Sequence, residues 1–216
     1  MQYQLNIAFD DEGLEQIYGA AQTVTLVRSF TSGADSYVAW VTFQPFENNI
    51  ITWTESYYIY ATTYPLQTGK SLVILSQTQE VVQPGWTYTL ENGMFVGAAG
   101  GASNAYSAEN QQYNGINFGL VEEAVINGVT TSAPINGVAV LVNQAAAFVP
   151  LENVAVFLSS YSKNGVVLSS VPSNALVVTF TTETPVANVS FNDDTNTFYL
   201  VGTTVQFASQ ADIALR

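Results

Sequence analysis

The chain contains no cysteine and no histidine, and only four of its 216 residues are basic. Disulfides, thiolate nucleophiles, and zinc or iron–sulfur sites built on cysteine or histidine therefore cannot form. Catalytic triads that depend on histidine are excluded as well, and no imidazole can transfer protons near neutral pH. We expect a protein that is not an enzyme, although general acid–base chemistry by carboxyl groups stays open.

Positive charge is scarce, because seventeen acidic residues against four basic ones give a net charge of −13. Nucleic acids and anionic membranes bind to basic surfaces, and neither lysine lies in a glycine-rich phosphate loop. We therefore expect no nucleic-acid partner. Charged residues make up only 10% of the chain, whereas about 25% is usual, so uncharged polar residues must provide most of the polar surface.

The N-terminal residues lack the basic and apolar regions of a signal peptide, and the first basic residue is Arg28. No apolar run approaches the roughly 20 residues of a membrane-spanning helix. We expect a protein made without a signal peptide, which is cytoplasmic or is released from the cell by a leaderless route or by lysis.

Alternation of apolar and polar residues predicts strands over most of the chain. Trp86, Tyr88 and Leu90, for example, alternate with threonines. Asn-Gly dipeptides favour the positive φ of tight hairpin turns, and Asn92-Gly93 is the strongest of these, ahead of Asn164-Gly165. The pattern predicts an all-β fold, an antiparallel β-sandwich with one short N-terminal helix. The expected strands are 37–43, 50–53, 56–62, 71–76, 86–90, 94–97, 138–142, 154–160, 166–169, 176–182, 187–191, 197–201 and 204–208.

The expected helix begins after Asp10, which can cap it. Leu14, Ile17 and Tyr18 follow at helical spacing, and Gly19 can end it. We expect this helix to pack against a sheet.

Residues 101–112 are rich in glycine, alanine, serine and asparagine, which is typical of a flexible loop or linker. They divide the chain into a β module with the helix at 1–100 and a second β module at 113–216, packed into the same compact unit. A similar order of strands and turns occurs at 40–63 and 177–204. This similarity fits either a duplicated module or the common appearance of two β-meanders.

Aromatic residues gather in the first half of the chain. Tyr58 and Tyr60 share one face of their strand, while Tyr57 shares the other face with Ile59. At least one set is expected to point outward and to hold a sugar ring or a lipid head group, and packing in the core is the alternative. The candidate ligand-binding residues are Trp53, Tyr57, Tyr58, Tyr60, Tyr64 and Trp86.

Asn192, Asp193, Asp194 and Asn196 provide oxygen ligands in one short loop between strands, and such ligands suit Ca²⁺. The loop lacks the glycine and the final glutamate of an EF-hand, and asparagine and aspartate are also ordinary turn residues. We therefore expect no cofactor, with Ca²⁺ at this loop as the alternative.

Paired carboxylates are the remaining catalytic candidates. Glu122 and Glu123 are adjacent, so on a strand they point to opposite faces and cannot act together. A glycosidase pair of distant residues, such as Glu47 with Glu55, stays open.

These observations predict a non-enzymatic, self-associating protein that binds glycans or lipid head groups through its aromatic residues. It would be lectin-like, or a cytolysin-like toxin that assembles on membranes. The alternative is a structural or assembly protein, such as a virion, fibre or inclusion component, because exposed strand edges favour association. In each class the chain is expected to form a homo-oligomer.

Overall fold

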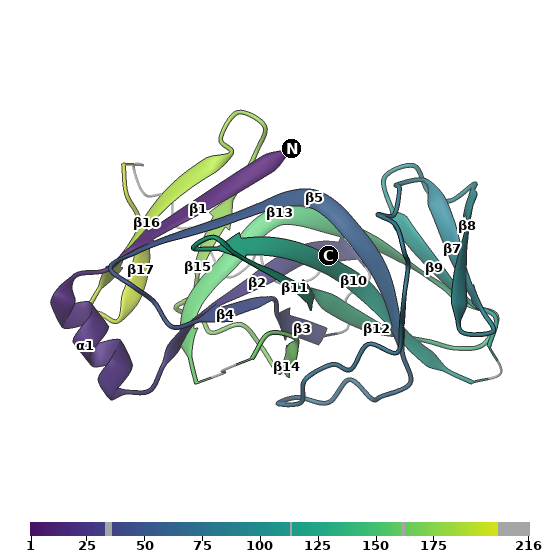
Figure 1. The fold of residues 1–216 in the computed structure, drawn as a ribbon, viewed down its shortest axis with the longest axis horizontal. Helices are drawn as coiled ribbons and strands as arrows, with labels where there is room; N and C mark the ends of the chain where they lie inside the picture. The colour runs from purple at the N-terminus through teal and green to yellow at the C-terminus, as the bar shows by residue number, and fades with distance from the viewer. Residues whose placement is uncertain (33–35, 113, 161–162, 203–216) are drawn as a thin grey trace.

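The computed structural model describes residues 1–32, 36–112, 114–160 and 163–202, which form two packed β-sheets and one short helix (Figure 1). A ten-stranded sheet has the order β14 (Val166–Leu168), β3 (Ser36–Ala39), β12 (Asn136–Val140), β10 (Ile116–Ile126), β5 (Asn48–Thr62), β1 (Gln2–Ala8), β16 (Val186–Asn192) and β17 (Thr197–Leu200). In addition, β11 (Val129–Pro134) pairs with β10, and β6 (Ser76–Gln77) pairs with β5.

The seven-stranded sheet has the order β4 (Val41–Phe43), β2 (Thr23–Ser32), β13 (Ala145–Ser159), β9 (Tyr106–Asn110), β7 (Trp86–Glu91) and β8 (Met94–Ala99), with β15 (Leu176–Thr179) beside β13. The predicted all-β sandwich is thus confirmed in its class. The sheets are not purely antiparallel, however, because β1 runs parallel to β16 and β7 runs parallel to β9.

The helix α1 (Asp11–Gly19) is the one expected from the sequence. Asp10 caps it by accepting a hydrogen bond of 2.8 Å from the backbone N–H of Gly13. Ile17 is buried against the core. A Cβ added at Gly13 would lie 3.0 Å from a ring carbon of Phe191, so the glycine permits this close approach between the helix and the sheet.

The strands β5 and β13 curve across the molecule, and each is the longest strand of its sheet (Figure 1). Along the first half of β5, Ile51 and Trp53 are buried while their neighbours are half-buried or exposed. From Tyr57 onward almost every residue is buried. Tyr57 packs against Tyr106 of the seven-stranded sheet on one face, and on the other face Tyr60 lies against Gly119 and the carbonyl of Asn136. Tyr57 and Tyr60, on opposite faces, are therefore both covered, and neither face of this strand points outward as expected.

Several expected elements differ from those observed. Five strands were not expected from the sequence: β1, β2, β9, β10 and β11. Of the strand expected at 71–76, only the short β6 and an isolated bridge at Ser71 form. The strand expected at 204–208 lies outside the described residues.

The tight turns form in part where Asn-Gly pairs occur. Asn92-Gly93 joins β7 to β8 with φ angles of 50° and 78°, which confirms the strongest hairpin prediction. Asn127-Gly128 joins β10 to β11 in the same way. Asn164-Gly165 does not close a hairpin, because the strand that follows it, β14, pairs with β3.

The division into two modules joined by a linker does not fit the structure. Residues 101–112 contain β9, which lies between β13 and β7 and buries Ala108 and Asn110. Strands from both halves of the chain also alternate within each sheet, since β1 lies between β5 and β16. Small residues at 101–112 therefore reflect tight packing of an inner strand rather than a flexible connection.

The two similar stretches are only partly alike in space. Both begin with a strand of the seven-stranded sheet, β4 or β15, and continue into a strand of the ten-stranded sheet, β5 or β16. The first stretch then continues as one long strand, whereas the second turns back as the β16–β17 hairpin.

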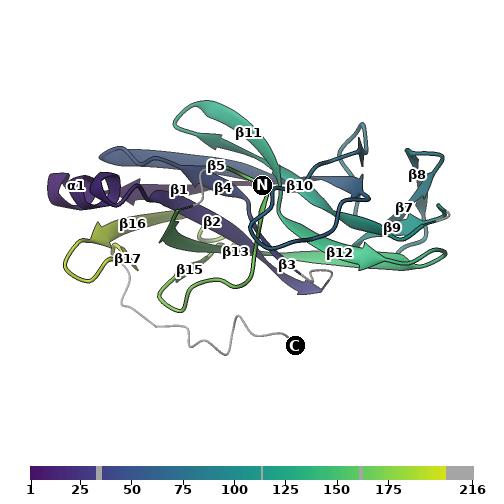
Figure 2. The same cartoon turned by 90° about the horizontal axis from the view of Figure 1, so that it is seen from below.

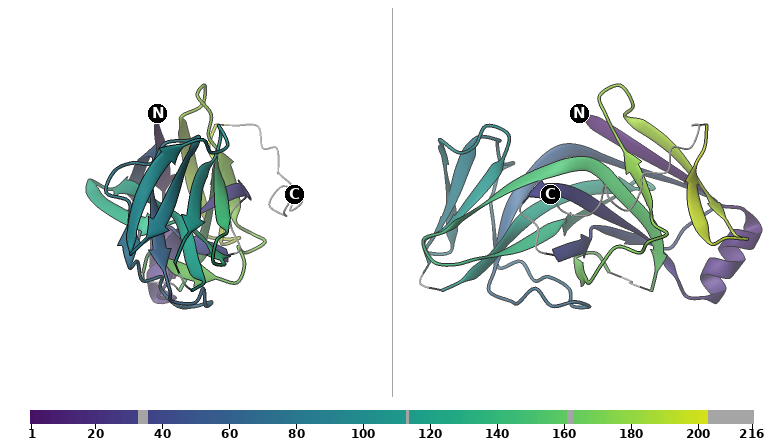
Figure 3. Two further views of the ribbon diagram at one scale, coloured as in Figure 1. Left: turned by 90° about the vertical axis from the view of Figure 1, so that its right-hand side faces the viewer. Right: turned by 180° about the vertical axis from the view of Figure 1, so that it is seen from behind.

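The molecule is elongated, with α1 at one end and the β7–β8–β9 strands at the other (Figures 1 and 2). Figure 3 shows this second end facing the viewer in its left panel. In the part of the chain that the structure describes, no helix has the length and apolar character needed to cross a membrane.

Candidate functional site

The aromatic residues expected to line a surface surround a buried charge instead. Trp53, Tyr57 and Tyr60 are between 0% and 3% exposed. Tyr58 and Trp86 are half-buried, and Tyr64 is exposed. The aromatic patch expected from the sequence therefore does not exist as one surface, because β5 is covered on both faces where most of these residues lie.

The buried charge is Arg28 on β2, whose guanidinium lies against two tryptophan rings. Its central carbon is 5.5 Å from the ring centroid of Trp40 and 5.8 Å from that of Trp53. Trp40 and Trp53 meet edge to face, with centroids 5.6 Å apart. Aromatic faces attract a cation more strongly when water is absent, so this arrangement favours the charged form of Arg28.

Two glutamates from different sheets meet the same guanidinium. Glu152 on β13 accepts hydrogen bonds of 2.8 and 2.9 Å from Nη2 of Arg28. Glu122 on β10 places Oε2 3.0 Å from Nε of Arg28, close enough for an ion pair but not aligned as a hydrogen bond. Because Glu122 belongs to the ten-stranded sheet and the other two to the seven-stranded sheet, the cluster links the sheets.

Hydroxyl and indole groups complete the surroundings of Glu152. Tyr57 donates its hydroxyl hydrogen to Oε1 of Glu152 over 3.1 Å, and Trp53 donates its indole N–H to Oε2 over 3.4 Å. Burial raises the pKa of Tyr57, and the nearby Glu122 adds to this effect. The hydroxyl of Tyr57 therefore stays protonated and acts as a donor.

Arg28 and Glu122 are both fully buried, and burial disfavours the charged form of each. Burial raises the pKa of Glu122 to about 8, although the guanidinium of Arg28 acts in the opposite direction. For Arg28, burial alone favours the neutral form, but Glu122, Tyr57 and Glu152 together raise its pKa above the ordinary value. Glu122 is therefore the group of this cluster whose charge changes with pH near neutrality, while Arg28 stays charged.

This arrangement predicts that the protein loses stability as the solution becomes alkaline. A buried carboxyl with a raised pKa stabilises the fold fully below its ordinary pKa, and this contribution is lost as the pH rises through about 8. We expect the free energy of unfolding to fall between about pH 5 and about pH 9 by on the order of a few kcal/mol. Chemical denaturation at several pH values measures this.

The matched variant is Glu122→Gln, which keeps the shape of the side chain and removes its titration. It should show a clearly smaller fall over the same pH range, since Arg28, Glu152, Glu55 and Tyr57 are unchanged around it. Equal pH dependence in both proteins would show that Glu122 does not ionise in this range.

The cluster is closed to a substrate. The side chains of Arg28 and Glu122 are 0% exposed, and that of Glu152 is 18% exposed. A catalytic acid must reach the atom that it protonates, and Glu122 meets only protein atoms unless the sheets separate. Its geometry therefore suits a role in holding the two sheets together.

Neither of the two carboxylate pairs considered from the sequence has the geometry of a catalytic pair. Glu123 is exposed while Glu122 is buried, which confirms that they point to opposite faces. Glu47 directly precedes β5 and Glu55 lies within it, eight residues further along a strand that rises about 3.3 Å per residue, so they are about 25 Å apart. Glycosidase carboxyl groups lie within about 10 Å of each other, so Glu47 and Glu55 cannot act as such a pair.

The loop proposed for Ca²⁺ forms the turn between β16 and β17. Oδ1 of Asn192 accepts hydrogen bonds from the backbone N–H and the hydroxyl of Thr195, at 2.9 and 2.8 Å. Such bonds from an asparagine side chain to nearby residues are usual in turns, and Asn196 has a φ of 53°. Within the described ranges no three acidic side chains gather closely enough to hold a metal. Calcium binding by Asn192, Asp193, Asp194 and Asn196 stays a prediction.

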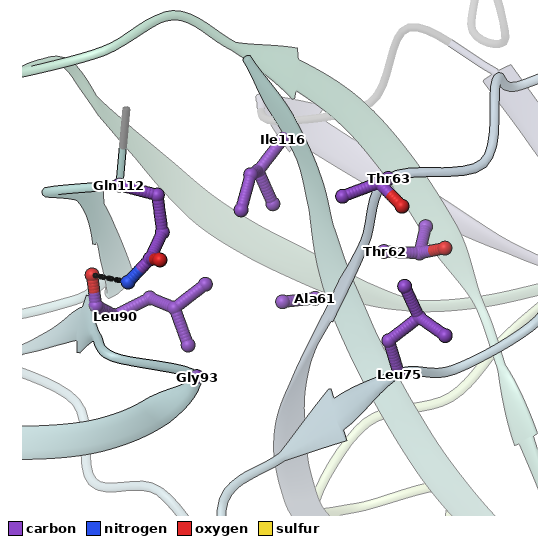
Figure 4. Close-up of a pocket in the computed structure, with 8 residues that line it drawn as sticks. All are labelled: Ala61, Thr62, Thr63, Leu75, Leu90, Gly93, Gln112 and Ile116. Atoms are coloured by element: carbon purple, nitrogen blue, oxygen red, sulfur yellow. Dashed lines mark hydrogen bonds between the residues drawn. The ribbon is translucent and has the colours of Figure 1, made fainter. Parts of the chain in front are cut away.

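An apolar hollow of about 180 Å³ lies between β5, β10 and the β7–β8 hairpin (Figure 4). Leu75, Leu90 and Ile116 provide most of its wall, and Gln112 donates a hydrogen bond of 3.3 Å to the carbonyl of Leu90 beside it. Pockets for small organic ligands usually have about 300 Å³ or more. The hollow is therefore of a size to take one side chain rather than a whole ligand.

Charge is distributed unevenly along the molecule. Seven acidic residues surround α1 and the turns packed beside it, where Phe9 contacts Phe198 and bonds to the carbonyl of Glu47. The opposite end, by contrast, contains the stretch 92–108, which has no charged residue. We call the end that contains α1 the acidic end. Its acidic residues are Asp10, Asp11, Glu12, Glu15, Glu47, Asp193 and Asp194.

Apolar side chains are exposed at the end opposite the acidic end. Leu75, Met94, Val96 and Leu141 are 55–67% exposed. Ser76 donates a hydrogen bond to the carbonyl of Gly93, which ties the segment of Leu75 to the β7–β8 hairpin. We call this region, formed by β8 and the segments around Leu75 and Leu141, the neutral end. Glu91 and Glu109 lie on the neighbouring strands β7 and β9.

No pattern along the chain predicts the Arg28 cluster. Glu122 and Glu152 lie far from Arg28 along the chain, and Glu122 is followed directly by a second glutamate, which is exposed. A single buried charge within a strand is the only feature that could have indicated it, since such charges are almost always paired. No family model, curated protein or solved structure matches this chain, so its function must be inferred from the fold and its chemistry.

Proposed function

We propose that this chain is a non-enzymatic structural protein that associates with copies of itself. The observation that carries the proposal is the neutral end, where apolar side chains are exposed on a sheet with an open edge. Exposed apolar groups beside an open edge favour association. The closed Arg28 cluster supports a structural rather than a catalytic role, because its charged groups are directed at each other.

Charge supports a second copy of the chain rather than another class of partner. A net charge of −13 repels nucleic acid and anionic lipid. It also opposes association of identical chains, unless they meet where charge is absent. The neutral end meets this condition, since the acidic end lies at the other extreme of the long axis (Figure 1).

The proposal predicts that association strengthens with salt. Raising the ionic strength from about 0.01 M to about 1 M shortens the screening length from roughly 30 Å to 3 Å. Repulsion between acidic chains then falls while apolar contacts persist. Sedimentation velocity over a range of protein concentrations should show larger species at high salt and without added ligand. A single monomeric species at every salt and protein concentration would contradict self-association.

Binding to glycans or lipid head groups, the lectin-like or cytolysin-like alternative, has less support, because Trp53, Tyr57 and Tyr60 are buried. Dye release from phosphatidylcholine vesicles, with and without sterol, separates the two classes. The structural role predicts intact vesicles at protein concentrations where the chain is already associated. Release of dye would instead favour a membrane-active protein.

A further inference from the structure

The β8 strand is the least protected sheet edge among the described residues. It pairs only with β7, and its other side is open. The edge strands β4, β14, β15 and β17 have three or four residues, and the longer β11 ends in Pro134. In contrast, β8 has six residues, with neither a charge nor a proline, the devices that usually protect an edge from pairing.

The turn before β8 determines which backbone groups point to the open side. In a two-residue hairpin loop, the residues that flank the turn exchange both hydrogen bonds, and the bonding direction then alternates along the strand. Glu91 and Met94 flank the Asn92-Gly93 turn. Met94, Val96 and Ala98 therefore bond to β7, while the N–H and C=O groups of Phe95, Gly97 and Ala99 point to the open edge.

We propose that β8 is the joint between two copies of the chain, which pair antiparallel across a two-fold axis at Gly97. This inference rests on the proposed self-association and names its surface. A two-fold axis normal to the sheet keeps the outer faces of both copies on the same side. Gly97 then faces Gly97 of the second copy, and Phe95 faces Ala99, so every outward backbone group finds a partner.

Other registers leave more of the outward backbone N–H and C=O groups of β8 without a hydrogen-bond partner. An axis at Val96 would pair Phe95 with Gly97 and leave Ala99 without a partner in both copies. With the axis at Gly97, Val96 lies opposite Ala98 on the outer face, in a non-hydrogen-bonded pair where side chains approach closely. The small Ala98 leaves room for Val96, and both are exposed in the single chain.

The inner face of the strand fits the same joint. A Cβ added at Gly97 would lie 2.7 Å from a ring carbon of Tyr88, so the ring lies directly over the glycine. Trp86 stacks beside Tyr88, with centroids 6.4 Å apart. Two copies joined at Gly97 would thus place their Tyr88 rings on the same side of one continuous sheet. No like charges meet there, since residues 92–108 are uncharged.

The first test places a lysine on this edge. Val96 and Val129 are both valines on edge strands, 62% and 69% exposed. Val96→Lys and Val129→Lys each reduce the net charge of −13 by one unit, so general repulsion falls equally in both. We expect Val96→Lys to weaken dimer formation at least tenfold, because charges at an edge oppose pairing, while Val129→Lys associates like the unchanged chain.

The second test measures the register with disulfides, which is direct because the chain has no cysteine of its own. Val96→Cys and Ala98→Cys are prepared as separate proteins and oxidised alone or mixed. The Gly97 axis places residue 96 opposite residue 98 of the other copy and leaves identical residues about 7–8 Å apart diagonally, beyond the usual reach of a disulfide. Cross-linked dimers should therefore form mainly in the mixture.

The outcomes separate this inference from the proposed function. If the unchanged chain associates but Val96→Lys has no effect and the mixture does not cross-link, the joint lies elsewhere and self-association stands. Strong cross-linking of Val96→Cys alone overturns the register. If the unchanged chain is monomeric under all conditions, both the proposed function and the joint are wrong.

Discussion

Replacing Arg28 with methionine should lower the free energy of unfolding by about 3–5 kcal/mol, the usual cost of removing one partner from a buried ion pair. The change leaves Glu152 without the cation that donates to both of its oxygens. It also removes the cation that lies against the rings of Trp40 and Trp53. Denaturant titration, followed by the fluorescence of these tryptophans, measures the loss.

Lys70→Met is the matched control, because it removes the same charge from an exposed position. It should change stability by no more than about 0.5 kcal/mol. A second variant, in which Arg28→Met is combined with Glu122→Leu and Glu152→Leu, should recover much of the loss, since apolar side chains can replace a whole buried charged group. A loss below about 1 kcal/mol for Arg28→Met would show that the ion pairs do not hold the sheets together.

The parts of the fold that follow from local rules could be predicted from the sequence. Asp10 needs only the N–H of Gly13 to cap α1, and Asn92-Gly93 needs only its own backbone angles to form a hairpin. The alternation around Trp53 likewise matches one buried and one more exposed face of β5. Each of these features depends on neighbours within a few residues.

The rest depends on contacts between distant segments. The strand β9 was mistaken for a linker because its small residues suit both a flexible loop and a tightly packed strand, and only its neighbours β7 and β13 distinguish the two. Pairing of β2 with β13 brings Arg28 and Glu152 together. Glu122 joins them only when the ten-stranded sheet, which contains β10, packs against the seven-stranded sheet. The burial of Tyr60 follows from its backbone neighbours Asn136 and Gly119, which lie far along the chain.

Tyr58 and Tyr60 allow a direct test of how contacts with distant segments decide burial, because they are the same residue type on one strand. Tyr60 is fully buried, and its hydroxyl donates a hydrogen bond of 2.8 Å to the carbonyl of Asn136. A Cβ added at Gly119 would lie 2.5 Å from a ring carbon of Tyr60, so the ring fills the space above that glycine. Tyr60→Ala should therefore cost about 3–5 kcal/mol of stability, the usual range for a large buried aromatic.

Tyr58→Ala should cost about 1 kcal/mol, because Tyr58 is only half-buried. Tyr60→Phe should also lie near 1 kcal/mol, since it removes one hydrogen bond and keeps the ring. Thermal and chemical unfolding of the three variants gives this order directly. Equal losses for Tyr58→Ala and Tyr60→Ala would mean that β5 is not covered on both faces beyond Tyr57, and the aromatic surface expected from the sequence would then have to be reconsidered as a binding site.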